Sequence, residues 1–195
     1  MRILLGDSEI REGVRRLGRE IQAFYGQRPL TIVGVMTGSV MFLADLLREL
    51  AMPLRVGVIQ ARSYRDGRAG KLVINADFMP HIAGRDVLIV DDIFDTGQTL
   101  FELTDQIDHL QPRSVRLAVL LTKAGRKRVG MEPDHVGFDI PNDFVVGYGL
   151  DYRDAYRHLP YIAILEEPDR VAAERMAEEV ERGAGVGGPE AGISR

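Results

Sequence analysis

The sequence predicts an α/β fold in which a mostly parallel, twisted sheet is flanked by helices. Two observations lead to this prediction. Short apolar runs rich in β-branched residues, such as Leu30–Val35, are typical of buried strands. They alternate with amphipathic stretches of helical period, such as Ser8–Tyr25, and this alternation favours a parallel sheet. Sheets of this kind bind their ligands outside the carboxyl ends of the strands.

The first half of the chain is predicted to run helix, strand, helix, strand. Ser8 precedes the first apolar residue of helical spacing, so we expect it to cap a helix that ends at Tyr25. A strand at 30–35 is followed by a turn, a helix at 40–50 and a strand at 54–60. The two helices are expected to face the core with Ile10, Val14, Leu17, Ile21 and Phe24, and with Phe42, Leu43, Leu46, Leu47 and Leu50.

The second half begins with a polar, glycine-punctuated stretch at 61–75, which we expect to be a long exposed loop. The patterns that follow predict strands at 86–90, 114–122 and 161–165, short strands and turns at 136–152, and helices at 99–110 and 169–182. The first of these helices should face the core with Leu100, Leu103, Ile107 and Leu110.

The composition indicates one globular domain. A chain of 195 residues that is 45% hydrophobic suits a single core, which we place at 1–182, with the Gly-rich stretch 183–195 as a disordered tail. The net charge of −4 argues against a nucleic-acid partner, and the short apolar runs argue against a membrane span or signal peptide. The chain has no cysteine, and its four histidines lack metal-ligand spacing, so we expect a cytoplasmic protein without disulfides.

Three aspartates stand where an apolar run stops. Asp91 and Asp92 directly follow Val87–Val90, and Asp95–Thr99 is predicted to turn the chain into a helix. Gly97 permits a backbone conformation that other residues resist, and the amides and threonine hydroxyls of this turn are suited to binding an anion. The carboxylates would repel that anion unless they contact sugar hydroxyls or Mg²⁺. A phosphorylated sugar would therefore satisfy the whole stretch.

A plainer interpretation is that the aspartate and threonine only cap the helix that follows them. Both residue types are common at helix N-caps. The sequence leaves the two interpretations open, because capping and phosphate binding can coexist.

The stretch VLIVDDIFDTGQTL, Val87–Leu100, resembles the phosphoribosyl-diphosphate (PRPP) motif of type I phosphoribosyltransferases: four apolar residues, two acids, two apolar residues and D-T-G-x-T. Within that superfamily, GVMTGSVMFLADLLREL, the SY before the long loop and VGFDIPNDFVVGYGLDYRDAYRHLPYIAIL resemble the hypoxanthine-guanine phosphoribosyltransferases. The resemblance covers roughly Val33–Leu165. It implies the type I phosphoribosyltransferase fold with a small hood region.

The same resemblance implies purine salvage, in which the 5-phosphoribosyl group passes from PRPP to hypoxanthine or guanine with Mg²⁺ as cofactor. The products would be IMP or GMP and pyrophosphate. Asp91 and Asp92 would hold the ribose hydroxyls and a Mg²⁺ ion, and Asp95 would act as the general base near purine N7. The PRPP-binding residues that it implies are Asp91, Asp92, Asp95, Thr96, Gly97, Gln98 and Thr99.

The purine would be bound by residues from two later stretches. Lys123 matches the lysine that donates to purine O6, which would exclude adenine because an ammonium has no acceptor. Phe144 would stack on the base, the carbonyl of Val145 would accept from the guanine amine, and Asp151 would hold a second Mg²⁺. Without the resemblance, Lys123 would be taken as a solvated strand-end lysine, Phe144 as a core residue and Asp151 as a turn residue.

Pyrophosphate would lie on the turn after the first predicted strand, at Thr37 and Gly38, with Arg157 as a further donor. The resemblance implies a cis peptide bond between Met36 and Thr37. Many relatives carry lysine in place of Thr37, and some carry a basic residue in place of Asp143, so these departures bear on the affinity for pyrophosphate and PRPP. The long loop would be a mobile lid that includes Ser63 and Tyr64.

Two other functions remain open. One is a PRPP- or nucleotide-sensing regulator on the same fold, against which the acidic balance and the lack of residues for a helix-turn-helix both count. The other is a phosphoribosyltransferase that prefers xanthine, which shares the 6-oxo group. The resemblance further implies a homodimer or homotetramer.

Overall fold

Two sheets organise the part of the chain that the computed structural model describes, residues 1–63, 72–125 and 129–184. The larger has six strands in the order β4-β3-β2-β5-β6-β7, and the smaller has three in the order β1-β9-β8. The strands of the larger sheet are β2 (Leu30–Met36), β3 (Leu54–Ser63), β4 (Leu72–Phe78), β5 (Asp86–Phe94), β6 (Ser114–Lys123) and β7 (His135–Ile140). Those of the smaller sheet are β1 (Arg2–Leu5), β8 (Val145–Val146) and β9 (Ile162–Ile164).

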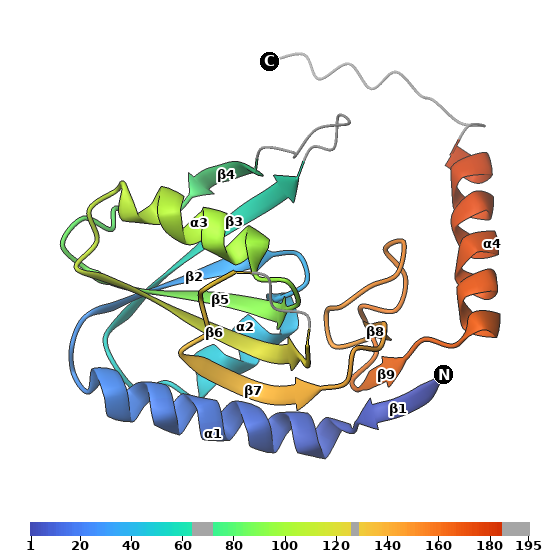
Figure 1. Cartoon of the computed structure of the whole chain (residues 1–195), viewed down its shortest axis with the longest axis horizontal. Coiled ribbons are helices and arrows are strands. Elements are labelled where there is room, and N and C mark those ends of the chain that lie inside the picture. The colour runs from blue at the N-terminus through green and yellow to red at the C-terminus, as the bar shows by residue number, and fades with distance from the viewer. Residues whose placement is uncertain (64–71, 126–128, 185–195) are drawn as a thin grey trace, which may run out of the picture.

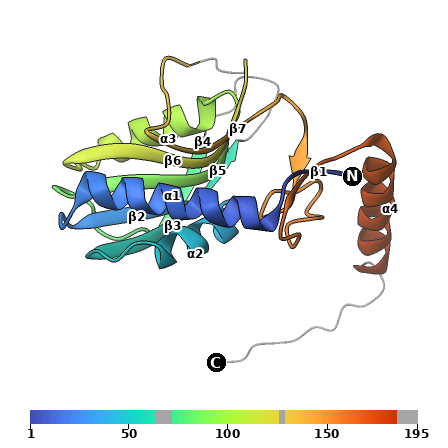
Figure 2. The ribbon, with the colours of Figure 1, turned by 90° about the horizontal axis from the view of Figure 1, so that it is seen from below.

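The larger sheet is parallel except at one edge, where β4 runs antiparallel to β3. Helices α1 (Asp7–Tyr25) and α2 (Val40–Arg48) cover one face of it, and α3 (Gln98–Asp108) covers the other, as Figures 1 and 2 show. Helix α4 (Glu167–Ala184) stands beside the smaller sheet (Figure 1). The predicted α/β class is confirmed.

The alternation of side chains along β5 explains the three layers. Leu88 and Val90 belong to the apolar cluster under α1 and α2, whereas Val87 and Ile89 belong to the cluster under α3. All four are fully buried. Successive strand residues point to opposite faces, so an unbroken apolar run is what a strand covered on both faces requires.

The smaller sheet forms a hood beyond the carboxyl ends of the parallel strands (Figure 1). Its middle strand β9 pairs antiparallel with β1 on one side and with β8 on the other. The N-terminal residues therefore complete a sheet whose other strands come from the last third of the described chain. The hood itself was predicted, but β1 was not, because four residues carry too little periodicity to be recognised as a strand.

Several predicted boundaries are wrong. Helix α1 starts at Asp7 with Gly6 as its N-cap, not with Ser8, and Glu9 accepts a hydrogen bond from the Gly6 N–H at 2.8 Å. The predicted 61–75 loop is partly strand, since β3 continues through Ser63 and β4 starts at Leu72. Among side chains predicted to face the core, those of Phe24 and Leu110 are instead exposed.

The helix predicted at 169–182 is longer than expected, since α4 spans Glu167–Ala184. Helix α4 continues past residue 182 to Ala184, so the helix runs into the stretch predicted as a tail. The remainder of that stretch, 185–195, lies outside the described residues.

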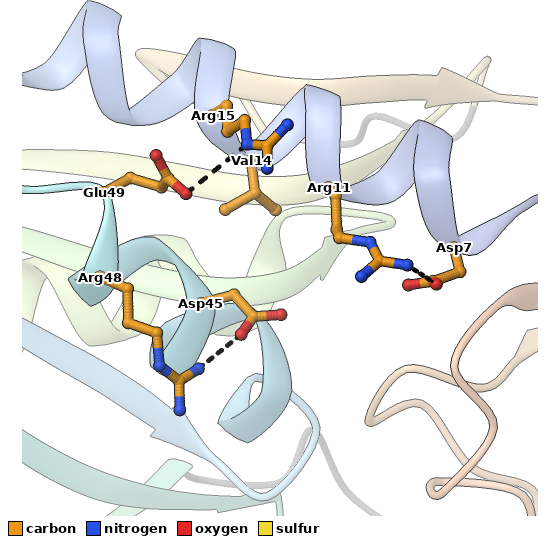
Figure 3. Close-up of a pocket in the computed structure, with 7 residues that line it drawn as sticks. All are labelled: Asp7, Arg11, Val14, Arg15, Asp45, Arg48 and Glu49. Atoms are coloured by element: carbon orange, nitrogen blue, oxygen red, sulfur yellow. Dashed lines mark hydrogen bonds and ion pairs between the residues drawn. The ribbon is translucent and has the colours of Figure 1, made fainter.

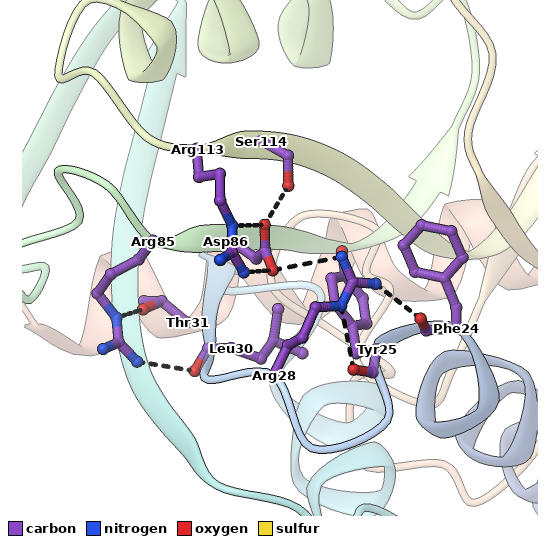
Figure 4. A network of polar contacts seen from close by, with 9 residues as sticks. All are labelled: Phe24, Tyr25, Arg28, Leu30, Thr31, Arg85, Asp86, Arg113 and Ser114. Atoms are coloured by element: carbon purple, nitrogen blue, oxygen red, sulfur yellow. Dashed lines mark hydrogen bonds and ion pairs between the residues drawn. The ribbon is translucent and has the colours of Figure 1, made fainter.

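A buried carboxylate fixes the other end of the parallel sheet (Figure 4). Asp86, the first residue of β5, has a side chain that is 2% exposed. Arg113 donates to it from Nε at 2.9 Å and pairs through Nη2 with its second oxygen, and Ser114 Oγ donates at 2.7 Å. Arg28 Nη1 lies 3.7 Å from the same carboxylate. The hydrogen bond from Arg113 lowers the pKa of Asp86.

Replacing Asp86 with Asn should lower the free energy of unfolding by on the order of 2 kcal/mol, because the substitution removes a charge-assisted, fork-shaped contact at a buried site. Since the folded-state pKa of Asp86 is lowered, its contribution is present above about pH 4 and is lost as the pH falls through the lowered pKa. Urea unfolding between pH 3 and 7 measures both effects.

In that experiment the stability difference between wild type and D86N should shrink towards acid pH. Asp105→Asn, at an exposed position on α3, is the matched control and should change the free energy of unfolding little. A difference between wild type and D86N that stays constant with pH would contradict the assigned ion pair.

Candidate active site

The site lies where two neighbouring parallel strands end. β2 and β5 pair in the larger sheet, and each is followed by a turn and the start of a helix, α2 or α3. A cavity of about 240 Å³ opens at the end of β5. It is lined by Asp91, Asp92, Ile93, Phe94, Asp95, Thr96, Gly97, Thr99 and Leu100. Six of the seven residues predicted to bind PRPP are thus brought together at this cavity.

Helix α3 presents its N-terminus to this cavity through Gly97, Thr99 and Leu100. Gly97 occupies the N-cap position with φ of 81°, and a Cβ added there would lie 2.4 Å from the Phe94 ring. Glycine is therefore required for both backbone conformation and space. The plainer interpretation, in which an aspartate or threonine caps α3, is met in part. Gly97 holds the N-cap position, but the Thr96 hydroxyl accepts a hydrogen bond from the Gln98 N–H at 3.4 Å. The positive end of the helix dipole faces the cavity and favours an anion.

Asp91 and Asp92 form an adjacent pair of carboxylates on the cavity wall. Strand β5 continues to Phe94 rather than ending at Val90, and the Asp92 N–H donates to Asp91 Oδ1 at 3.0 Å. Burial raises the pKa of Asp91 well above its usual range, and the neighbouring Asp92 charge adds to the effect. Burial also raises the pKa of Asp92. The pair is costly to ionise without a cation or hydroxyl donors.

The turn after β2 touches this pair through a glycine. A Cβ added at Gly38 would lie 1.7 Å from Asp92 Oδ2, so no other residue fits there without displacing the carboxylate. On its other side Gly38 meets Gly149, where an added Cβ would lie 2.0 Å from the Gly38 carbonyl oxygen. The Met36–Thr37 peptide bond in this turn is cis, as the family resemblance implied. Thr37 itself is exposed.

Arg157 holds the hood segment that meets this turn. Its Nη1 donates to the Gly149 carbonyl at 2.8 Å, and its Nη2 lies 2.9 Å from carboxylate oxygens of Asp151 and Asp154. The positive charge of Arg157 also opposes the rise in the pKa of Asp92. Asp151, predicted to hold a second Mg²⁺, and Arg157, predicted to bind pyrophosphate, are therefore in direct contact with each other.

The residues predicted for the purine lie on β6 and at the start of β8. Lys123, the last residue of β6, has a side chain only 12% exposed, and its Nζ is 3.9 Å from Asp95 Oδ2. Phe144 is 41% exposed and is therefore not the core residue that its sequence context alone suggested. Val145, in contrast, is buried in β8.

Some predicted residues lie apart from the cavity or outside the described chain. The side chain of Gln98 lies along α3, where its Nε2 donates to Glu102 Oε1 at 2.5 Å. Gln98 therefore does not line the cavity. Ser63 is the last residue of β3, and the predicted lid partner Tyr64 lies outside the described residues.

Sequence reasoning missed Gly149 and Asp154. Gly149 has φ of 101°, and the glycines of the GYG sequence were the only signal that could have pointed to a close approach there. The role of Asp154 as a partner of Arg157 had no sequence signal, because an exposed aspartate in a turn is common.

A second cavity, of about 210 Å³, lies between α1 and α2 and contains none of the predicted site residues (Figure 3). Its lining is mostly charged, and its charges pair with one another at the surface, Arg48 with Asp45 and Arg11 with Asp7. Exposed pairs of this kind contribute little. Asp45 also accepts from the hydroxyl of Tyr148 at 2.7 Å, which ties α2 to the hood.

Comparison with known proteins identifies the family. The model of the phosphoribosyl transferase domain matches residues 6–153. The hypoxanthine-guanine phosphoribosyltransferase of Streptococcus pneumoniae strain R6 is 40% identical over 168 residues, which cover 85% of this chain and 93% of that protein. The chain belongs to the hypoxanthine-guanine phosphoribosyltransferase family. A hypoxanthine phosphoribosyltransferase structure from Staphylococcus aureus aligns with a TM-score of 0.82 at 36% identity, covering 86% of this chain and 92% of that one.

One relative is much longer. The bifunctional protein TilS/HprT of Listeria innocua is 43% identical over 167 residues, which cover 85% of this chain but only 26% of that protein. This phosphoribosyltransferase chain thus spans about a quarter of the length of that relative. The domain match ends at residue 153, so it contains the cavity, Lys123 and Phe144, whereas Arg157 and α4 lie beyond it. None of the helices in the described residues is long and apolar enough to cross a membrane.

Replacing Asp91 with Asn should flatten the pH dependence of stability of the ligand-free phosphoribosyltransferase. Because the folded-state pKa of Asp91 is raised, the folded protein binds more protons than the unfolded chain above about pH 4, and stability falls as the pH rises towards the raised pKa. D91N carries no such proton, so its free energy of unfolding should fall less between pH 5 and 8. Urea unfolding in the presence of a chelator measures this, and equal slopes for D91N and wild type would contradict the assignment.

Replacing Gly38 with Ala should lower the free energy of unfolding, because the Cβ of an alanine at this position would overlap Asp92 Oδ2 and force the turn or the carboxylate to move. Overpacking of this kind costs about 1–3 kcal/mol. Gly130→Ala is the matched control, because a Cβ at Gly130 meets nothing within 4 Å. Urea unfolding compares the two variants, and equal free energies of unfolding in G38A and G130A would refute the contact.

Proposed function

We propose that this protein catalyses the Mg²⁺-dependent transfer of the 5-phosphoribosyl group from PRPP to hypoxanthine or guanine, releasing pyrophosphate. The observation that carries the proposal is the single cavity wall on which two carboxylates of raised pKa, Asp91 and Asp92, stand next to the N-terminus of α3. Hydroxyl-binding and phosphate-binding groups side by side match one ligand, a phosphorylated ribose.

In this proposal the ribose lies on the acidic pair. Asp91 and Asp92 accept hydrogen bonds from the 2′- and 3′-hydroxyls, which also relieves the cost of burying the charged form of each carboxylate. The 5′-phosphate lies on the turn from Asp95 to Thr99 at the start of α3. The ribose is thereby held at both ends, with its anomeric carbon free to react.

The side chains present suit Mg²⁺. No group of three or more carboxylates and histidines gathers as a metal site within the described residues, and Mg²⁺ is commonly held by one or two carboxylates together with substrate oxygens. Asp91 and Asp92 would hold one such ion, and Asp151 would hold a second. When bound, Mg²⁺ would neutralise charge on the pyrophosphate leaving group.

Asp95 and Lys123 are placed for the base. Their charged atoms are 3.9 Å apart at the ends of neighbouring strands, so a purine that reaches both can present O6 to the lysine and N7 to the carboxylate. In the proposed reaction Asp95 holds the N7 proton of the entering base while N9 attacks the anomeric carbon. The ammonium of Lys123 donates to O6 and offers no acceptor to the amino group of adenine.

Pyrophosphate release with each of five bases tests the proposal. With PRPP and Mg²⁺, hypoxanthine and guanine should be turned over, whereas adenine and uracil should not. The rate with xanthine shows whether this third 6-oxopurine is also a substrate. Lys123→Ala should lower the ratio of kcat/KM for hypoxanthine to kcat/KM for adenine. In a site built for one hydrogen-bonding pattern, this ratio reaches about 10⁴.

One outcome would decide against this function, and another against the role of one residue in it. Pyrophosphate release that is absent with every base would reject the transfer reaction itself. A hypoxanthine-to-adenine ratio left unchanged by K123A would reject only the role of Lys123. Arg116→Ala, at a charged residue on the same strand but away from its carboxyl end, serves as the control and should leave the ratio unaltered.

A further inference from the structure

Helix α4 reaches the proposed purine site through one side chain. The guanidinium carbon of Arg170 lies 5.6 Å from the centroid of the Phe144 ring, a distance at which a cation over an aromatic face is attracted to it. Tyr152 meets the same ring edge-on, with centroids 5.5 Å apart and planes at 87°. Phe144 nevertheless remains 41% exposed. The Phe144 ring is contacted over one face and at one edge but is still partly exposed, so its other face is free.

The contact is held by further interactions between α4 and the hood. Tyr152 donates to Glu174 Oε1 at 2.7 Å, one helical turn beyond Arg170, and Ala173 is buried. Near the start of the helix, the Tyr156 hydroxyl donates to the carbonyl of Asp169 at 3.0 Å. Two successive turns of α4 therefore pack on the segment that carries Tyr152 and Tyr156. The position of Arg170 over the ring is set by the packing of the helix.

Arg170 has no competing partner for its charge. Within the described residues its guanidinium takes part in no hydrogen bond or ion pair, and its Nε is buried without an acceptor. An arginine that is half-buried without a carboxylate has the aromatic ring as its main favourable contact. Ion pairing therefore does not account for Arg170, whereas contact with Phe144 does.

We propose that Arg170 is a positioning residue for the purine. Its guanidinium packs against one face of Phe144 and holds the ring in the orientation in which the other face stacks on the base. This inference rests on the proposed function, because it assigns the free face of Phe144 to a purine. Arg170 lies beyond residue 153, the last residue matched by the phosphoribosyl transferase domain, so α4 adds this support from outside the matched domain.

The consequence is a selective effect on the base. A ring that is less well held offers a poorer stacking surface, which weakens purine binding in the ground state and in the transition state alike. The KM for hypoxanthine then rises, while kcat and the KM for PRPP stay near their wild-type values. Loss of α4 packing in general would instead lower stability and change all three parameters together.

Arg170→Met tests the proposal, because methionine keeps an unbranched apolar stem and the helix propensity of arginine but removes the guanidinium and its charge. The KM for hypoxanthine should rise about three- to tenfold, the range expected for a partly buried cation–aromatic contact. Arg170→Lys should rescue part of the loss, since lysine keeps the charge without the flat guanidinium. Arg175→Met, at an exposed arginine on the same helix, should match wild type.

Each outcome separates this inference from the proposed function. A wild type that releases no pyrophosphate with any base overturns the function. A wild type that turns over hypoxanthine, with an unchanged purine KM in R170M, overturns only the role of Arg170, as does an equal rise in R175M. If R170M fails to fold, R170K decides, because a wild-type purine KM in that folded variant would also overturn the role of the guanidinium. Thermal unfolding of each variant monitors the fold.

Discussion

The close approach of Gly38 to Asp92 is the constraint on which the site depends. The turn after β2 and the end of β5 can touch only because a hydrogen atom stands where a Cβ would lie 1.7 Å from the carboxylate. The hood adds a third segment to the same point, where Gly149 packs against the Gly38 carbonyl oxygen. Three stretches that are far apart in the sequence thus meet through two glycines, and Arg157 holds the last of them in place through the Gly149 carbonyl.

The two ends of β5 show opposite uses of the same residue type. At its amino end, Asp86 is surrounded by donors from Arg113 and Ser114, its pKa is lowered, and its charge stabilises the fold. At its carboxyl end, Asp91 and Asp92 are next to each other, and burial raises the pKa of both. Carboxylates with raised pKa values, such as Asp91 and Asp92, are typical of functional sites, whereas the paired Asp86 is typical of a structural contact.

The sequence predicted those features of the fold that depend on local pattern. The apolar run Val87–Val90 was recognised as a buried strand, and the D-T-G-x-T stretch located the cavity, because both are encoded in consecutive residues. The pairing of β1 with β9 could not be predicted in the same way, since it joins residues from opposite ends of the described chain. Local pattern alone could not predict the exposure of Phe144 either, because that exposure depends on how the hood packs around the ring.

The charges of the site bear on how a polyanionic substrate could enter it. Asp91, Asp92 and Asp95 line the cavity. Among the described residues, Lys123 lies close to Asp95, and Arg157 is paired with Asp151 and Asp154. Thr37 carries no charge, so the turn after β2 offers only backbone and hydroxyl groups. Among the described residues, a pyrophosphate group without bound cations would thus meet carboxylates and already paired cations, and the N-termini of α2 and α3 supply only partial charges. For the proposed reaction, the substrate must therefore bring its own divalent cations, and the carboxylates that would repel a bare anion become the groups that hold its metal complex.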